Sequence, residues 1–138
     1  MSIILVTGGA GNVGRQAVVR LAKAGHDVRV FDLPDLDYSF INEHTNIEVF
    51  HGDISEKSHL TRACDGIDWA VHLAAIMPPL SEENNELANR INIDGTRNIL
   101  KALKPEIPIV FASSVATYGV PTTKIVDIDH PQKPIDFY

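Results

Sequence analysis

The sequence is short of cysteine, of long apolar runs and of clustered basic residues. Its 138 residues include one cysteine, Cys64, which can form no internal disulfide and lacks the companions of a metal site. We therefore expect Cys64 to be a small buried residue in a reducing compartment. No apolar run approaches the roughly 18 residues that span a bilayer, and the first residues lack the basic stretch of a signal peptide. These shortages predict a cytoplasmic protein with no membrane partner.

The charged residues argue against nucleic acid as a partner. The formal net charge of -6 comes from 18 acidic and 12 basic residues, and the basic residues are spread singly along the chain. A protein that follows a phosphate backbone gathers lysine and arginine into a patch or stripe. We expect the surplus acid to form an ordinary solubilising surface.

The sequence does contain a regular alternation of short apolar runs and amphipathic segments. The pattern predicts strands at residues 3–7, 28–32, 47–50, 69–75 and 107–112, and helices at residues 12–24, 55–63 and 83–103. Residues 33–46 and 119–137 are the least regular. Because strand–helix–strand crossovers are right-handed, the alternation predicts an α/β fold of Rossmann type. We expect a doubly wound parallel sheet with strand order 3-2-1-4-5, forming a single domain.

A glycine-rich turn follows the first predicted strand. It reads Thr7-Gly8-Gly9-Ala10-Gly11-Asn12-Val13-Gly14, which fits GxxGxxG from Gly8 and GxGxxG from Gly9. A pyrophosphate that approaches the backbone closely requires glycine, and the free N–H groups of the following helix then hold the anion. A tight turn without a ligand is the alternative, which the position between a strand and a helix disfavours. The expected cofactor-binding residues are Gly8, Gly11, Asn12, Val13 and Gly14.

Two acids follow the second and third predicted strands. Asp32, 18 positions after Gly14, can accept hydrogen bonds from both hydroxyls of an adenosine ribose and would repel a 2′-phosphate. No arginine stands beside Asp32 in the sequence, so NAD is favoured over NADP as the cofactor. Asp53 and Ile54 lie where an adenine would bind, at the carboxyl edge of the sheet. Asp53 and Glu56 also fit a helix capping box, and the two interpretations stay open.

Small residues follow the fourth predicted strand. Ala74 and Ala75 would let a dinucleotide lie against the backbone, so we expect both to line the cofactor. Residues 77–80 come next and are expected to form one wall of the substrate side. His72 by itself is more typical of a core histidine with satisfied hydrogen bonds than of a catalytic one.

Taken in order, these residues resemble the extended branch of the short-chain dehydrogenase/reductase superfamily, the NAD-dependent epimerases and dehydratases. The resemblance covers essentially the whole chain. Its marks are the glycine turn, Asp32, Asp53, His72-Leu73-Ala74-Ala75, Asn92-Ile93-Asp94-Gly95-Thr96 and Ser113-Ser114-Val115-Ala116-Thr117-Tyr118-Gly119.

The resemblance implies roles for residues near the end of the chain. Ser114 matches the catalytic serine, Ser113 would help to line the cofactor site, and Tyr138, 24 positions after Ser114, is the candidate catalytic acid/base. Asn92 matches an asparagine that shapes this site. Tyr118 is interpreted as structural or substrate-side. Capping of the strand end by the serines, and a buried polar role for Asn92, are the alternatives.

The resemblance also implies an activity and a longer enzyme. The expected reaction is hydride transfer from a secondary alcohol carbon of a nucleotide sugar to NAD, as epimerase, dehydratase or dehydrogenase. The family's lysine four positions after the tyrosine is absent, so we expect residues 1–138 to be an incomplete NAD-binding domain that is inactive alone. A homodimer through the long helix is implied as well. A non-catalytic NAD(P)-binding module or redox-sensing relative is the alternative function.

Overall fold

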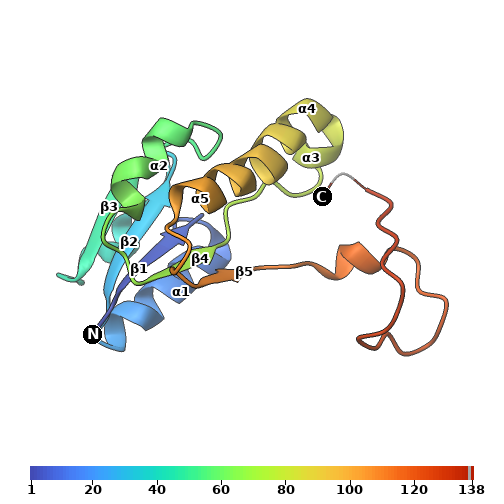
Figure 1. The fold of residues 1–138 in the computed structure, drawn as a ribbon, viewed down its shortest axis with the longest axis horizontal. Helices are drawn as coiled ribbons and strands as arrows, with labels where there is room; N and C mark the ends of the chain where they lie inside the picture. The colour runs from blue at the N-terminus through green and yellow to red at the C-terminus, as the bar shows by residue number, and fades with distance from the viewer. Residues whose placement is uncertain (137) are drawn as a thin grey trace.

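A five-stranded parallel sheet forms the centre of the computed structural model, which describes residues 1–136 and 138 (Figure 1). The strand order β3-β2-β1-β4-β5 confirms the predicted fold and topology. The strands are β1 (Ile3–Thr7), β2 (Asp27–Asp32), β3 (Ile47–His51), β4 (Trp69–His72) and β5 (Ile109–Phe111). β4 is shorter than predicted because its partner β1 ends at Thr7, which pairs with His72, and the glycine turn follows directly.

Helices cover both faces of the sheet. Helix α1 (Asn12–Lys23) packs on one face, and α2 (Lys57–Cys64) and α5 (Thr96–Ala102) pack on the other. Because successive strand residues point to opposite faces, Leu5 enters the core beneath α2 and α5 while its neighbours enter the core beneath α1. This division confirms the doubly wound arrangement.

The predicted helix at residues 83–103 is confirmed over residues 85–102, but it is not one regular α-helix. A short helix, α3 (Leu80–Glu83), is followed by α4 (Asn85–Ala88), a π-helical segment η2 (Asn89–Gly95) and then α5. The run restarts at α4 because the Asn84 side chain accepts a hydrogen bond from the Leu87 N–H at 2.9 Å. A π turn widens the helix at the residue, Asn92, that the resemblance had singled out.

Residues 112–136 form an arm that leaves the sheet and turns back toward α3 in the view of Figure 1. Apart from the short 3-10 turn η1 (Ser39–Ile41), both stretches predicted as irregular lack helix and strand where they are described. A second 3-10 turn, η3 (Val115–Tyr118), precedes the later stretch. Phe137, the last residue of the second stretch, lies outside the described residues. Across the described chain, none of the helices has the length and apolar character needed to cross a membrane.

The arm is held by contacts within itself. Gly119 has φ +62°, and a Cβ there would lie 1.9 Å from the Lys133 carbonyl oxygen, so two backbone segments meet at this residue. His130 is buried, and its ring lies edge-on to Tyr118 at 5.7 Å between centroids. These contacts join residues 118–119 to residues 130–133 within the arm.

Replacement of Gly14 by alanine is expected to destabilise the fold strongly. A Cβ at Gly14 would lie 2.0 Å from the Gly8 carbonyl oxygen, which is backbone that cannot yield without shifting α1. We expect Gly14→Ala to lower the free energy of unfolding by about 3 kcal/mol or more, measured by urea denaturation.

A second glycine provides the control for this prediction. Gly25 has φ +87° but no atom within 4 Å of a built Cβ, and asparagine tolerates that backbone conformation. Gly25→Asn should therefore change stability by no more than about 1 kcal/mol. Equal losses in the two variants would contradict the close packing assigned to Gly14.

Candidate functional site

The predicted binding residues gather at the carboxyl edge of the sheet. Thr7 at the end of β1 pairs with Phe31 of β2 on one side and with His72 of β4 on the other. Asp32 follows Phe31 directly, and the glycine turn follows Thr7. The edge therefore joins the glycine turn, the second-strand acid and the start of the loop after β4.

The glycine turn packs directly against that loop. Gly8 has φ +69°, and a Cβ there would lie 2.7 Å from the Ala74 backbone nitrogen. Any side chain at this position would push the two segments apart. Ala74 is half-buried and Ala75 is exposed, so a ligand at this edge can reach backbone over both residues.

The first turn of α1 is free to receive an anion. Gly11 is the N-cap and offers no side chain, and the first turn contains no acid. In the described structure, no hydrogen bond uses the N–H groups of Asn12, Val13 or Gly14. Asn12 and Val13 are exposed residues at the start of α1, whereas Gly14 is buried against the turn. Unused N–H groups and the positive end of the helix dipole together favour a phosphate.

Asp32 is oriented by the turn itself. One carboxylate oxygen accepts a hydrogen bond from the Ala10 N–H at 2.9 Å, and the other accepts from the Leu33 N–H at 3.0 Å. Each oxygen keeps a lone pair for another donor, such as a ribose hydroxyl. Sequence reasoning found no arginine beside Asp32, but the fold brings Arg15 to the carbonyl oxygen of Ala10.

Tyr38 is a neighbour of Asp32 that sequence reasoning missed. Its hydroxyl donates to the Leu33 carbonyl oxygen at 2.6 Å. Burial, and then the negative charge of Asp32, raise the pKa of Tyr38 to about 12, so the phenol stays a neutral donor. Its ring also lies edge-on to His51, with the centroids 5.0 Å apart. The only available signal was a tyrosine six positions after the strand-ending acid.

Asp53 forms a local turn rather than a helix cap. Its carboxylate accepts from the Ser55 N–H at 2.8 Å, whereas α2 begins at Lys57 with Glu56 as its N-cap and no side-chain hydrogen bond there. The capping-box interpretation is therefore wrong. The Ile54 side chain is buried in the core, so only its backbone faces this edge; within the described residues its N–H has no acceptor.

His72 is a buried link between two threonines. Its Nδ1 lies 2.6 Å from Thr7 Oγ1 and its Nε2 lies 2.9 Å from Thr96 Oγ1. Thr96 Oγ1 donates its own proton to the Asn92 carbonyl oxygen at 2.6 Å, so it must accept from His72 Nε2–H. Nδ1 then accepts from Thr7, and the imidazole is neutral. Burial lowers the pKa of His72 to about 4, which agrees with this neutral form.

Asn92 completes the link to the loop after β4. Its side-chain oxygen accepts from the Ile76 N–H at 2.9 Å, and its side-chain nitrogen donates to the Ile76 carbonyl oxygen at 3.0 Å. Both halves of the amide are thus used on one residue of the loop. Asn92 holds this loop in position, and the π turn directs its side chain there.

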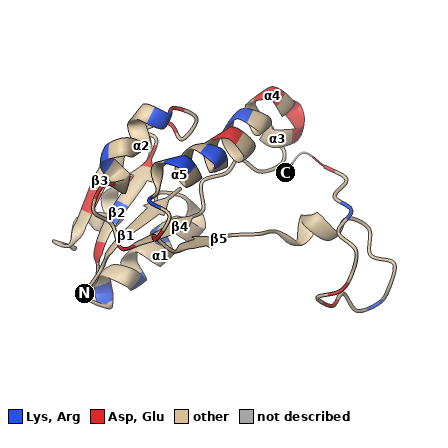
Figure 2. Cartoon of the chain, viewed as in Figure 1, with Lys and Arg blue, Asp and Glu red and all other residues tan. Residues whose placement is uncertain are grey.

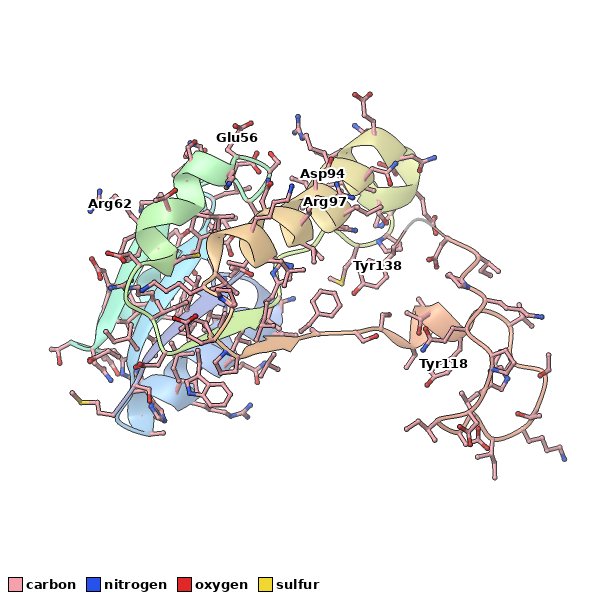
Figure 3. All side chains as sticks on the ribbon, viewed as in Figure 1. Glu56, Arg62, Asp94, Arg97, Tyr118 and Tyr138 are labelled. Carbon is pink, nitrogen blue, oxygen red and sulfur yellow. The ribbon has the colours of Figure 1, made fainter. Side chains whose placement is uncertain are left out.

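The two serines follow β5 in exposed surroundings. Ser113 is exposed, and Ser114 is half-buried with Oγ accepting from the Ala116 N–H at 3.1 Å. The Ser114 hydroxyl proton has no acceptor among the described residues. The structure records no hydrogen bond between Ser114 and Tyr138. Tyr118 lies on η3 and Tyr138 ends the arm, as labelled in Figure 3.

The expected substrate wall is apolar and next to acid. Met77 and Leu80 are 60% and 45% exposed. Glu82, Glu83 and Glu86 follow them, and Figure 2 shows the ribbon of α3 and α4 coloured red at acidic positions. This wall offers an apolar surface and no cation of its own.

A pocket elsewhere is explained without a ligand. It lies beside α2 and the end of α5 and is lined by Arg29, Phe50, Arg62 and Lys104 among others. Arg29 donates to the carbonyl oxygens of Ala63 and Asp65, where α2 ends. This arginine satisfies the end of the helix, which is a structural role.

Comparison with known proteins finds dehydrogenases by sequence. The 3-beta hydroxysteroid dehydrogenase/isomerase family matches residues 5–133. A 3 beta-hydroxysteroid dehydrogenase/Delta 5-->4-isomerase of Mycobacterium tuberculosis is 38% identical over 104 residues, covering 72% of this chain and 27% of that protein. The Homo sapiens sterol-4-alpha-carboxylate 3-dehydrogenase, decarboxylating, is 32% identical over 138 residues, covering 96% of this chain and 35% of the relative. The chain spans about a third of the length of such relatives.

Solved structures with the same fold were found as well. A short-chain dehydrogenase/reductase superfamily protein from Agrobacterium tumefaciens with bound NAD has a TM-score of 0.82 at 34% identity, covering 99% of this chain and 40% of that one. The UDP-glucose 4-epimerase from Brucella ovis in complex with NAD has a TM-score of 0.89 at 29% identity, covering 100% and 43%.

The buried imidazole should make stability depend on pH. The pKa of His72 in the folded state, about 4, lies below its ordinary value near 6.5, so the unfolded state binds more protons between these values. Stability is therefore complete above pH 6.5 and falls as the pH drops toward 4, by at most roughly 1.4 kcal/mol per pH unit from this group. Urea denaturation across this range measures the slope.

A non-titrating replacement tests the assignment to His72. His72→Gln should show a shallower loss of stability between pH 6.5 and 4 than the parent protein, whatever its absolute stability. His44→Gln is the matched control, because the His44 side chain makes no hydrogen bond in the described structure. An unchanged slope in His72→Gln would refute the assignment.

Proposed function

The chain belongs to the 3-beta hydroxysteroid dehydrogenase/isomerase family of extended short-chain dehydrogenase/reductases, and we propose that it is the NAD-binding part of a dehydrogenase acting on a secondary alcohol. One observation carries this proposal. The backbone of the glycine turn donates directly to the carboxylate of Asp32, so an anion site and a hydroxyl-binding acid share one edge. Relatives of known structure have NAD bound.

Each part of the cofactor has a matching set of groups. The free N–H groups at the start of α1 would hold the pyrophosphate, and Asp32 would accept from the ribose hydroxyls. Asp53 keeps one carboxylate oxygen for the adenine amino group, and the Ile54 N–H can donate to the ring. The charge of Asp32 favours NAD over NADP, because a 2′-phosphate would meet a like charge.

The catalytic groups are assigned from the loop after β5. Ser114 keeps a free hydroxyl proton that can bind the substrate oxygen, and Tyr138 would take the hydroxyl proton as hydride leaves the carbinol carbon. The bound nicotinamide supplies the hydride acceptor. Ser113 would line the cofactor, while Asn92 acts through the loop that it holds.

Two substrate classes are supported by different observations. A nucleotide sugar is favoured by the similarity to UDP-glucose 4-epimerases of known structure. A 3β-hydroxysteroid is favoured by the family match and by the exposed apolar wall of Met77 and Leu80, next to three acids. Such a wall suits an apolar ring better than a charged diphosphate. We therefore place the steroid class first for this chain.

Removal of the Asp32 carboxylate is expected to weaken NAD binding. Calorimetric titration should show at least about a tenfold higher dissociation constant for Asp32→Ala than for the parent protein. Asp35→Ala is the matched control, since it removes an exposed carboxylate three positions away. Absence of NAD binding by the parent protein would overturn the proposed function.

The substrate class is tested by measuring the reduction of NAD by the protein. A 3β-hydroxysteroid should give NADH with a rate that falls about a hundredfold or more in Ser114→Ala and in Tyr138→Phe. Turnover of a UDP-sugar instead would reverse the order of the two classes. Binding of NAD with no turnover of either class would favour the non-catalytic module.

A further inference from the structure

Arg15 makes more contacts than its place on an exposed helix would require. Its Nε and Nη2 both donate to the carbonyl oxygen of Ala10, at 3.2 and 2.9 Å. This carbonyl belongs to the glycine turn itself. The guanidinium therefore links the first turn of α1 to the loop that precedes the helix.

Ala10 is consequently held on both of its peptide groups. Its N–H donates to Asp32, and its carbonyl oxygen accepts the paired donors of Arg15. Two successive peptide planes between Gly9 and Gly11 are fixed by these side chains. Because the Ala10 N–H orients one oxygen of Asp32, a rotation of Ala10 would also change the direction of that carboxylate.

Arg15 also joins the glycine turn to the segment after β2. Its Nη1 lies 3.6 Å from an oxygen of Asp37, and its guanidinium carbon lies 5.4 Å from the centre of the Phe40 ring. Asp37 is itself fixed, because it accepts from the Ser39 N–H at 2.9 Å. One side chain thus braces the two segments on either side of Asp32.

We propose that Arg15 is a positioning residue that, by holding Ala10, sets the direction of the Asp32 carboxylate and so the preference for a ribose hydroxyl over a 2′-phosphate. This inference rests on the proposed cofactor site and adds a residue to it. Arg15 acts through hydrogen-bond geometry. A positive charge alone at this place would have the opposite effect, because it would attract the 2′-phosphate.

The two roles make opposite predictions for cofactor preference. If Arg15 positions Asp32, Arg15→Ala should weaken NAD binding about five- to tenfold and NADP binding much less, so that the NAD/NADP affinity ratio falls. If only the charge of Arg15 matters, Arg15→Ala should mainly weaken NADP binding, and the NAD/NADP affinity ratio should rise. Calorimetric titration of the protein with both nucleotides measures the ratio.

A lysine variant separates geometry from charge. Lysine keeps the charge but lacks the fork of donors that grips one carbonyl oxygen, so Arg15→Lys should lower the ratio nearly as much as Arg15→Ala. Arg20→Ala, on the same helix and exposed, removes one positive charge away from the turn and should leave the ratio unchanged. Arg15→Lys also carries the test if Arg15→Ala does not fold.

The outcomes distinguish this inference from the proposed function. NAD binding by the parent protein, with an unchanged or raised ratio in both Arg15 variants, would overturn the role of Arg15 alone. Restoration of the parent ratio by lysine would do the same. A parent protein that binds neither nucleotide would overturn the proposed function, and this inference with it.

Discussion

The close backbone contact between the glycine turn and its neighbours is the constraint on which the rest of the site depends. A side-chain carbon at Gly14 would meet the Gly8 carbonyl oxygen at 2.0 Å, and one at Gly8 would meet the Ala74 nitrogen at 2.7 Å. The close approach of Gly14 to Gly8 lets α1 begin at the edge of the sheet with its first N–H groups unused. The close approach of Gly8 to Ala74 brings the loop after β4 to the turn, so a ligand held by one segment also meets the other.

Side-chain hydrogen bonds then fix what the backbone has brought together. On one side, Thr7, His72, Thr96 and Asn92 form a continuous chain from β1 to the loop at Ile76. Because the Thr96 hydroxyl donates to the Asn92 carbonyl oxygen, His72 must donate to Thr96 and accept from Thr7. Burial keeps the imidazole neutral. On the other side, Asp32 accepts from the turn. Thr7 and His72 are buried and would be costly if unpaired, whereas Asp32 is half-buried.

The sequence was sufficient for the topology because short apolar strands and crossover helices allow few arrangements. It also located the glycine turn and Asp32, whose spacing is set by one strand–helix–strand unit. It failed where a choice depends on three-dimensional neighbours. The pattern did not show that Asn84 caps the start of the long helical run, or that Asp53 accepts a hydrogen bond from Ser55 instead of capping α2. The contact of Arg15 with Ala10 requires a turn that periodicity does not describe.

Residue-resolved NMR can show whether NAD binds at this edge of the sheet. In amide spectra of the protein titrated with NAD, we expect the largest shifts at residues 8–14, at Leu33, at Ile54 and at residues 74–76. The amide resonances of residues that line the pocket around Arg62 and Lys104 should stay unchanged. Shifts concentrated in that pocket, or the absence of shifts in the glycine turn at saturating NAD, would contradict NAD binding at this edge.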